Sequence, residues 1–247
     1  RVSGRVGVVV FPGSNCEHDV VEAIEGLGGE AELVWHGARS VSGIDALVLP
    51  GGFAHGDYLR PGALARFSPV MDAVRSFAAD GGPVMGVCNG FQILTEAGLL
   101  PGALQKNRHL KFLCATVSVR IERSRSFISR LTEPGSVLRL PINHFEGNYI
   151  CQPETLAQLR ADDRIVARYC DNPNGSIDDI AGITNEAGNV VGLMPHPERA
   201  YDNLLGSADG ASLLRSLLDP SGARSHPPAD EAGVASGAPG PAGSRLA

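Results

Sequence analysis

Short apolar runs alternate with helical stretches over the first hundred residues, and this alternation limits the possible folds more than any other feature of the sequence. The apolar periodicity predicts strands at 5–11, 31–35, 45–49 and 83–87, and helices at 15–27, 69–81 and 90–97, the second capped by Ser68. Alternating strands and helices of this kind form a mostly parallel sheet covered by helices. We therefore predict a three-layer α/β domain whose functional site lies at the carboxyl ends of the strands.

The middle of the chain has a different pattern. Apolar and polar residues alternate strictly over 116–122, which is typical of a half-exposed antiparallel strand. Further strands are expected at 137–140, 165–169 and 180–184, in a mixed sheet or in a small accessory antiparallel sheet. A final helix is expected over 207–218.

Length and composition indicate one folded domain followed by a tail. The chain has 247 residues and 43% hydrophobic content, enough for a full core, which we assign to residues 1–218. The remaining residues, 219–247, hold five prolines and five glycines but only two large aliphatic residues, so we expect disorder there.

Charge and cysteine content narrow the class of function. A net charge of -6 without a basic patch argues against nucleic-acid binding, and no apolar run approaches the length of about 20 residues that a membrane span needs. The five cysteines form no Cys-x-x-Cys pair, so we expect reduced thiols, no metal site and a cytoplasmic protein.

Cys88 is the first candidate for chemistry. It is the central residue of Gly-Val-Cys-Asn-Gly at 86–90, between an expected strand and an expected helix. This is the pattern of a nucleophile elbow, a sharp turn in which a side chain at either glycine would collide with neighbouring backbone. The helix beginning after the cysteine directs its N–H groups toward the sulfur and favours the thiolate. We predict that Cys88 is a nucleophile.

His196 and Glu198 are the expected partners of this nucleophile. They lie in Pro-His-Pro-Glu at 195–198, directly after the apolar run 190–194. In an extended segment, residues two apart project to the same side, so the carboxylate can orient the imidazole toward the sulfur. A surface His beside a surface Glu is the simpler interpretation, but the elbow makes a catalytic pair the stronger one.

A third motif follows the expected strand 45–49. Gly51 and Gly52, followed by Phe53, allow backbone amides to approach a bound group closely, as an oxyanion hole requires. The amide of Asn89 would supply a second donor.

Cys16 is the rival nucleophile. Gly-Ser-Asn precedes it and a helix follows, but no histidine-carboxylate pair is assigned to it, although His18 is near in sequence. We therefore expect a packed cysteine in the first turn of the helix.

These motifs together resemble the class I (triad) glutamine amidotransferases, most closely those of purine biosynthesis. The resemblance covers about the first 218 residues and is carried by segments 11–16, 50–60, 86–92, 98–102, 172–176 and 195–199. One departure is Phe145, where a small residue is expected.

The resemblance implies a flavodoxin-like fold and a definite reaction. Cys88 would attack the carboxamide of glutamine, His196 would protonate the leaving ammonia, and water would hydrolyse the thioester to glutamate. Gln92, one helical turn after Cys88, would help to bind glutamine. Ammonia would pass to an ATP-dependent synthetase subunit, and a small accessory subunit is expected in the same complex. ATP and Mg would be used by the synthetase partner, and no cofactor is expected in this chain.

Two other classes of function remain open. One is a different cysteine hydrolase of related fold, such as the intracellular-protease branch, in which the histidine follows soon after the nucleophile; here His196 lies 108 residues after Cys88. The other is a non-catalytic binding subunit, which loss of Cys88, His196 or Glu198 would have indicated.

Overall fold

A nine-stranded sheet forms the centre of the computed structural model, which describes residues 4–219. Across the sheet, the strands lie in the order β2 (Glu30–Trp35), β1 (Arg5–Val10), β3 (Ala46–Leu49), β4 (Val84–Val87), β11 (Val190–Leu193), β10 (Ile180–Thr184), β9 (Ile165–Tyr169), β6 (Leu113–Ile121) and β7 (Val137–His144). The pairs from β2 to β11 are parallel, and those from β11 to β7 are antiparallel. The predicted α/β class is confirmed.

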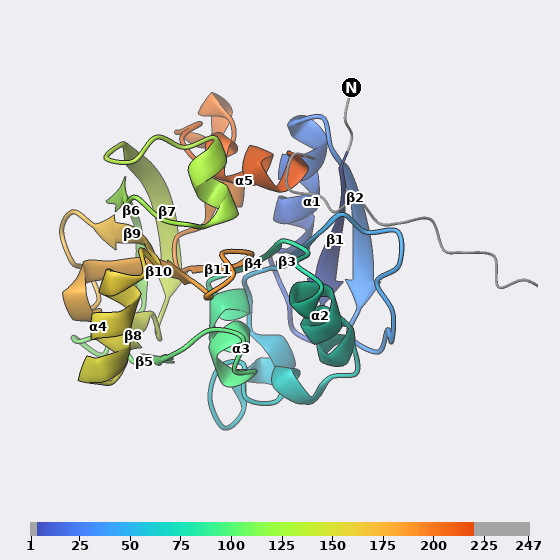
Figure 1. Ribbon diagram of the computed structural model, residues 1–247, viewed down its shortest axis with the longest axis horizontal. Coiled ribbons are helices and arrows are strands. Elements are labelled where there is room, and N and C mark those ends of the chain that lie inside the picture. The colour runs from blue at the N-terminus through green and yellow to red at the C-terminus, as the bar shows by residue number, and fades with distance from the viewer. Residues whose placement is uncertain (1–3, 220–247) are drawn as a thin grey trace, which may run out of the picture.

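Helices cover both faces of the parallel half. Figure 1 shows α1 (Glu17–Gly26) and α5 (Ala211–Leu218) on one side of the central strands, and α2 (Val70–Ala79) and α3 (Asn89–Glu96) on the other. All residues of β3, β4 and β11 are buried, because strands covered on both faces have no solvent side. This is why these strands read as continuous apolar runs.

The register of the three central strands fixes the place of the functional site. Leu49 of β3 pairs with Gly86 of β4, and Val87 pairs with Leu193 of β11. The segments that follow these three strands therefore leave the sheet at the same edge. The segments that begin at Pro50, Cys88 and Met194 meet there, as expected for the carboxyl ends of parallel strands.

The strands predicted in the middle of the chain extend this same central sheet. Strand β6 shows the expected antiparallel pairing and runs from Leu113 to Ile121. A separate two-stranded antiparallel sheet is present, but it consists of β5 (Ala103–Gln105) and β8 (Asn148–Ile150), which the sequence pattern did not indicate. Each has only three residues, too few to show a period of two.

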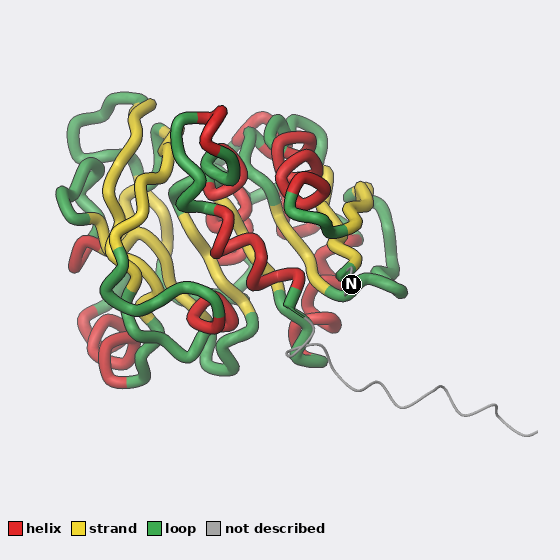
Figure 2. The backbone as a smooth tube through the Cα atoms, turned by 90° about the horizontal axis from the view of Figure 1, so that it is seen from above, coloured by secondary structure: helices red, strands yellow, loops and turns green. Residues whose placement is uncertain are grey.

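The antiparallel half of the sheet also contributes to the functional edge; Figure 2 shows the strands of both halves side by side, seen from above. The His196 N–H, just beyond β11, donates to the carbonyl oxygen of Pro141 in β7 at 2.8 Å. The last strand of the sheet thus reaches a site built on its central strands. The segment 143–147, which contains Phe145, begins within this strand, which ends at His144.

Several expected details are wrong. The Ser68 hydroxyl does not cap α2; it lies 3.3 Å from ring nitrogens of both His36 and His55. The final helix begins at Ala211 rather than 207, since Asp202 and Ser207 form a β-bridge before it. Helix α1 begins at Glu17, two residues later than expected. The unexpected helix α4 (Pro153–Ala161) has little apolar periodicity and one buried residue, Leu159.

The expectation of a disordered tail concerns residues that, apart from Asp219, lie outside the described ones. The boundary at residue 218 therefore stays a prediction. Within residues 4–219, no helix is long and apolar enough to cross a membrane.

Candidate active site

Cys88 lies on a sharp turn between β4 and α3, with φ +51° and ψ -106°. A non-glycine residue in this region is strained, which is the conformation of a nucleophile elbow. The flanking glycines permit it. A Cβ on Gly90 would lie 1.9 Å from the Leu49 carbonyl oxygen, and one on Gly86 would lie 2.7 Å from the backbone of Gly90. The predicted steric need for both glycines therefore agrees with the structure.

His196 and Glu198 form a buried pair. His196 Nδ1 lies 2.5 Å from Glu198 Oε1, and each residue is 1% exposed. The segment is not extended as predicted, because Pro197–Arg199 form one turn of 3-10 helix that begins after His196. This turn, rather than the alternation of a strand, brings the carboxylate back onto the imidazole.

The protonation of His196 is set by its neighbours. Burial alone would lower the pKa of the imidazole, but the negative charge of Glu198 and the Cys88 sulfur outweigh it, so the pKa lies well above its usual value. A protonated imidazole beside a sulfur nucleophile can serve as a proton donor.

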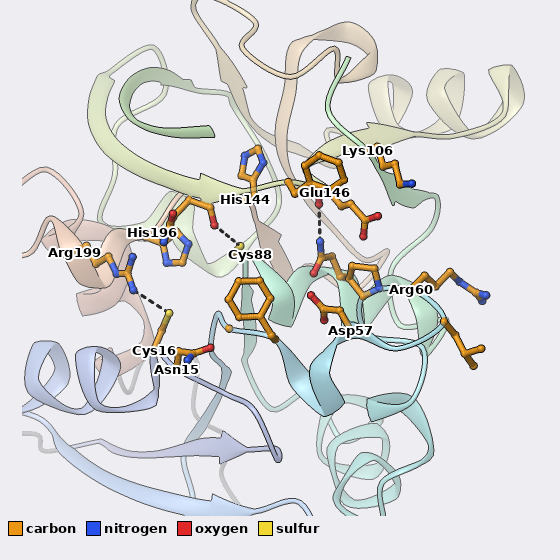
Figure 3. Close-up of a pocket in the computed structure, with 17 residues that line it drawn as sticks. Asn15, Cys16, Asp57, Arg60, Cys88, Lys106, His144, Glu146, His196 and Arg199 are labelled. Carbon is orange, nitrogen blue, oxygen red and sulfur yellow. Dashed lines mark hydrogen bonds between the residues drawn. The ribbon is translucent and has the colours of Figure 1, made fainter. Parts of the chain in front are cut away.

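Cys88 and His196 face one cavity of about 360 Å³ (Figure 3). The Cys88 thiol donates to the carbonyl oxygen of Asn143, at the end of β7, over 3.7 Å. His196 Nε2 is buried and has no hydrogen-bond partner within residues 4–219. The site therefore places a nucleophile and an available imidazole nitrogen around a space that a small substrate can enter.

The predicted oxyanion-hole residues line the same edge of the sheet. The Phe53 N–H donates to Gly13 O at 3.0 Å and is occupied, whereas that of Gly52 has no partner in the described part of the chain. Gly52 has φ +138°, and a Cβ there would lie 2.6 Å from the Asn15 nitrogen. The Asn89 amide is the first of α3, where N–H groups lack intrahelical acceptors.

The side chains of Asn89 and Gln92 form a network beneath the pocket. Asn89 Nδ2 donates to Gln92 Oε1 at 2.9 Å and to Asp57 Oδ1 at 3.2 Å, while Asn89 Oδ1 accepts from the Ala54 N–H. Gln92 lines the cavity as predicted from its spacing, and its Nε2 donates to the Glu146 carbonyl oxygen at 2.6 Å. Gln92 therefore also joins the elbow helix to the segment after β7.

Cys16 is more than the packed cysteine expected from its position. It is 4% exposed and lines the same cavity as Cys88, and its sulfur accepts from the Arg199 guanidinium at 3.1 Å. Arg199 is also bound to Asp19 at 3.0 Å. No sequence pattern indicates this arrangement, because the residues are some 180 positions apart.

One group within residues 4–219 has the donor types of a metal site. Ligand atoms of Cys16, His196 and Glu198 all lie within 4.8 Å of one another. The Arg199 guanidinium that donates to the Cys16 sulfur places a positive charge beside this group. That charge opposes binding of a cation, and we assign no metal there.

Several polar residues of the pocket were not singled out by sequence reasoning, among them Asp57, Lys106, His144 and Glu146. His144 is buried, and its Nδ1 lies 3.1 Å from Asn107 Oδ1. Burial and the charge of His196 lower the pKa of His144 to about 4, so its imidazole is neutral near pH 7. Asp57 lies in segment 50–60, which carries the family resemblance, but nothing in its local sequence indicates a role in the pocket.

Comparison with known families gives a match over most of the chain. Residues 3–211 match the model of the CobB/CobQ-like glutamine amidotransferase domain. The chain is 58% identical over 214 residues to a phosphoribosylformylglycinamidine synthase subunit PurQ from Rubrobacter xylanophilus, covering 87% of this chain and 97% of the relative. It is 57% identical over 217 residues to the subunit of the same name from Synechococcus elongatus, covering 87% and 98%.

Solved structures agree with these relatives. The fold matches a chain in a structure of PurLQS from Thermotoga maritima with a TM-score of 0.81 and 42% identity, covering 87% of this chain and 98% of that chain. A putative GMP synthase protein from Thermoplasma acidophilum shares the fold, with a TM-score of 0.59 and 19% identity over 88% of this chain and 94% of that one.

Proposed function

The chain belongs to the CobB/CobQ-like glutamine amidotransferase family, and from this membership we propose the reaction and the partners of its pocket. The protein is the glutaminase subunit of phosphoribosylformylglycinamidine synthase, in purine biosynthesis. Its partners are the synthetase subunit PurL and the small subunit PurS. ATP and Mg would be used by the synthetase subunit, with no cofactor in this chain. The free cysteines support a cytoplasmic location, because disulfides form and persist mainly in oxidising compartments.

The first half of the reaction forms a thioester. Cys88 and His196 share one proton, and with this proton on the imidazole the Cys88 thiolate attacks the carboxamide carbon of glutamine. The carbonyl oxygen takes up negative charge facing the Gly52 and Asn89 amides. His196 gives its proton to the amide nitrogen as the carbon–nitrogen bond breaks, so ammonia leaves. Glu198 holds the imidazole through Nδ1 and keeps Nε2 directed into the cavity.

The second half returns the site to its starting state. The now neutral His196 takes a proton from water, whose oxygen attacks the thioester carbon. The carbon–sulfur bond breaks, glutamate leaves, and His196 again carries the proton that the next ammonia requires. The observation that supports this cycle most directly is that the elbow cysteine and the buried histidine-glutamate pair share one cavity.

Replacing the nucleophile tests the assignment. Cys88→Ala should abolish glutamate release from glutamine while leaving the fold intact, because the sulfur supplies the covalent step. Synthesis from added ammonium should survive in the reconstituted complex. Glu198→Gln should retain more activity, since an orienting group contributes less than the nucleophile.

The control is Cys114→Ala, which changes an exposed cysteine on β6 and should leave both activities unchanged. Glutamine hydrolysis by Cys88→Ala at the wild-type rate, measured with purified protein, would show that the nucleophile is a different residue.

A further inference from the structure

The pocket has two chemically different ends. In Figure 3, Cys88 and His196 lie on one side, whereas Asp57, Glu146 and Lys106 lie on the other. All five residues line the same cavity. The charged side chains are thus separated from the nucleophile across the space that a substrate would fill.

The two carboxylates repel each other at this end. Burial and the charge of Glu146 raise the pKa of Asp57 to about 6, and burial likewise raises the pKa of Glu146 despite the opposing charge of Lys106. Neither acid has an ion pair within 4 Å in the described part of the chain. A cation placed between them would relieve this repulsion.

The side chain of Asp57 is held in place by a residue of the nucleophile elbow. Its Oδ1 accepts from Asn89 Nδ2, and Asn89 directly follows the nucleophile. The position of this carboxylate relative to the Cys88 sulfur is therefore fixed by one hydrogen bond and the first turn of α3.

Independent evidence of a polar ligand comes from two buried imidazoles. His144 and His196 are 3% and 1% exposed, both line the cavity, and the Nε2 atom of each lacks a hydrogen-bond partner among residues 4–219. Buried polar nitrogens without partners are rare in folded proteins, and a ligand that supplies hydrogen-bonding groups removes the cost.

The cations at this end differ in availability. Arg60 is engaged by Glu96, with Nε 2.5 Å and Nη2 2.8 Å from its two carboxylate oxygens. Lys106 has no ion pair in the part of the chain that the structure describes, and its ammonium lies 6.0 Å from the centre of the Phe145 ring. An anionic group of a substrate would therefore find its partner in Lys106.

We propose that this end of the pocket recognises the zwitterionic end of glutamine. Asp57, assisted by the negative charge of Glu146, binds the α-ammonium group, and Lys106 binds the α-carboxylate. The inference rests on the proposed glutaminase function and adds the residues that distinguish glutamine from other primary amides. Asp57 and Lys106 are specificity residues and take no part in the covalent steps.

Two truncated amides separate these contacts. Glutaramate is glutamine without its α-amino group, and 4-aminobutanamide is glutamine without its α-carboxylate. Each retains the carboxamide that Cys88 attacks. The assay measures ammonia release from all three amides by the chain assembled with its synthetase and small subunits, and compares kcat/KM.

In the wild-type complex, each truncation should lower kcat/KM by about 10- to 100-fold, the usual effect of losing a charge-assisted hydrogen bond. Asp57→Asn should remove most of the preference for glutamine over glutaramate and leave the preference over 4-aminobutanamide unchanged. Lys106→Met should do the reverse. The asparagine retains an oxygen that can accept from Asn89, so the network under the pocket is preserved.

The controls are Asp72→Asn on α2 and Lys111→Met, which change exposed residues that do not line the cavity and should alter neither preference. The inference is overturned if Asp57→Asn lowers kcat/KM equally for all three amides, since that is the result of a purely structural role through Asn89. It is also overturned if Lys106→Met leaves the preference over 4-aminobutanamide intact. Failure of the wild-type complex to hydrolyse any of the amides would instead reject the proposed glutaminase function.

Discussion

His144 is a buried imidazole that stays neutral in the native state. Its burial therefore lowers the stability of the protein at acid pH. Its pKa of about 4 lies below the usual 6.5, so between these values the unfolded chain takes up a proton that the native state excludes. Stability is lost as the pH falls through this window, by about 3 kcal/mol for a shift of this size.

We therefore expect His144→Gln to lose less stability than the wild type between pH 6.5 and pH 4. The measurement is urea unfolding at several pH values. His109→Gln, which changes an exposed histidine, is the control and should follow the wild type. Parallel curves for the wild type and His144→Gln would contradict this account. The opposing effect of Asp57, whose pKa is raised, is common to both proteins and cancels in the comparison.

Residues that carry a local signal could be predicted from the sequence, and others could not. Cys88 stands out because the elbow needs glycines within two positions, and His196 and Glu198 stand out because they follow a buried strand. Asp57 has no such signal, and the pattern around Cys16 predicted a packed cysteine rather than a residue of the pocket. Their place in the pocket depends on contacts with Asn89 and Arg199, which only the tertiary fold brings near.

At the scale of elements, the elbow sets the start of α3 against the end of β3 through a close backbone approach. The position of a Cβ on Gly90 is 1.9 Å from the Leu49 carbonyl oxygen, so α3 can begin where it does only if residue 90 lacks a side chain. Gly90→Ala must push α3 away from β3.

We expect Gly90→Ala to lower the free energy of unfolding by about 3 kcal/mol, at the upper end of the range for overpacking, and to reduce glutaminase activity. Thermal unfolding and glutamate release provide the two measurements. Gly37→Ala is the matched control, because its Cβ would make only ordinary contacts, at 3.4 Å from the Trp35 ring. Equal melting temperatures for the two variants would rule out the steric argument.

Whether a strand or turn could be predicted from the sequence depends on its burial and its length. Strands β3, β4 and β11 are buried on both faces, so their sequences are unbroken apolar runs. Strands β5 and β8 have three residues each and pair only with each other, so no periodicity could reveal them. The turn at 197–199 was also missed, because Pro at its first position is compatible with both extended and helical backbone.

For the whole molecule, the need to deliver ammonia to an acceptor predicts control by the partner. The isolated chain should release glutamate slowly and be activated by the synthetase subunit with its nucleotide and acceptor substrate. Rotation of the peptide at Gly51 and Gly52 is a sufficient cause, because one oxyanion donor is worth about 10²- to 10³-fold in rate. Glutamate production by the chain alone and by the complex is the measurement. Equal rates would show that the site is complete without a partner.

Strand β7 lies at one edge of the central sheet, where β6 is its only strand neighbour within residues 4–219, yet it closes the pocket through Asn143 and Pro141. An edge strand opens at a lower free energy than the strands inside a sheet, because fewer contacts hold it. Release of β7 would take the carbonyl groups away from Cys88 and His196 while the parallel half stays folded. Heat inactivation would then begin before the cooperative loss of secondary structure, and the working lifetime of the enzyme would be set by one strand.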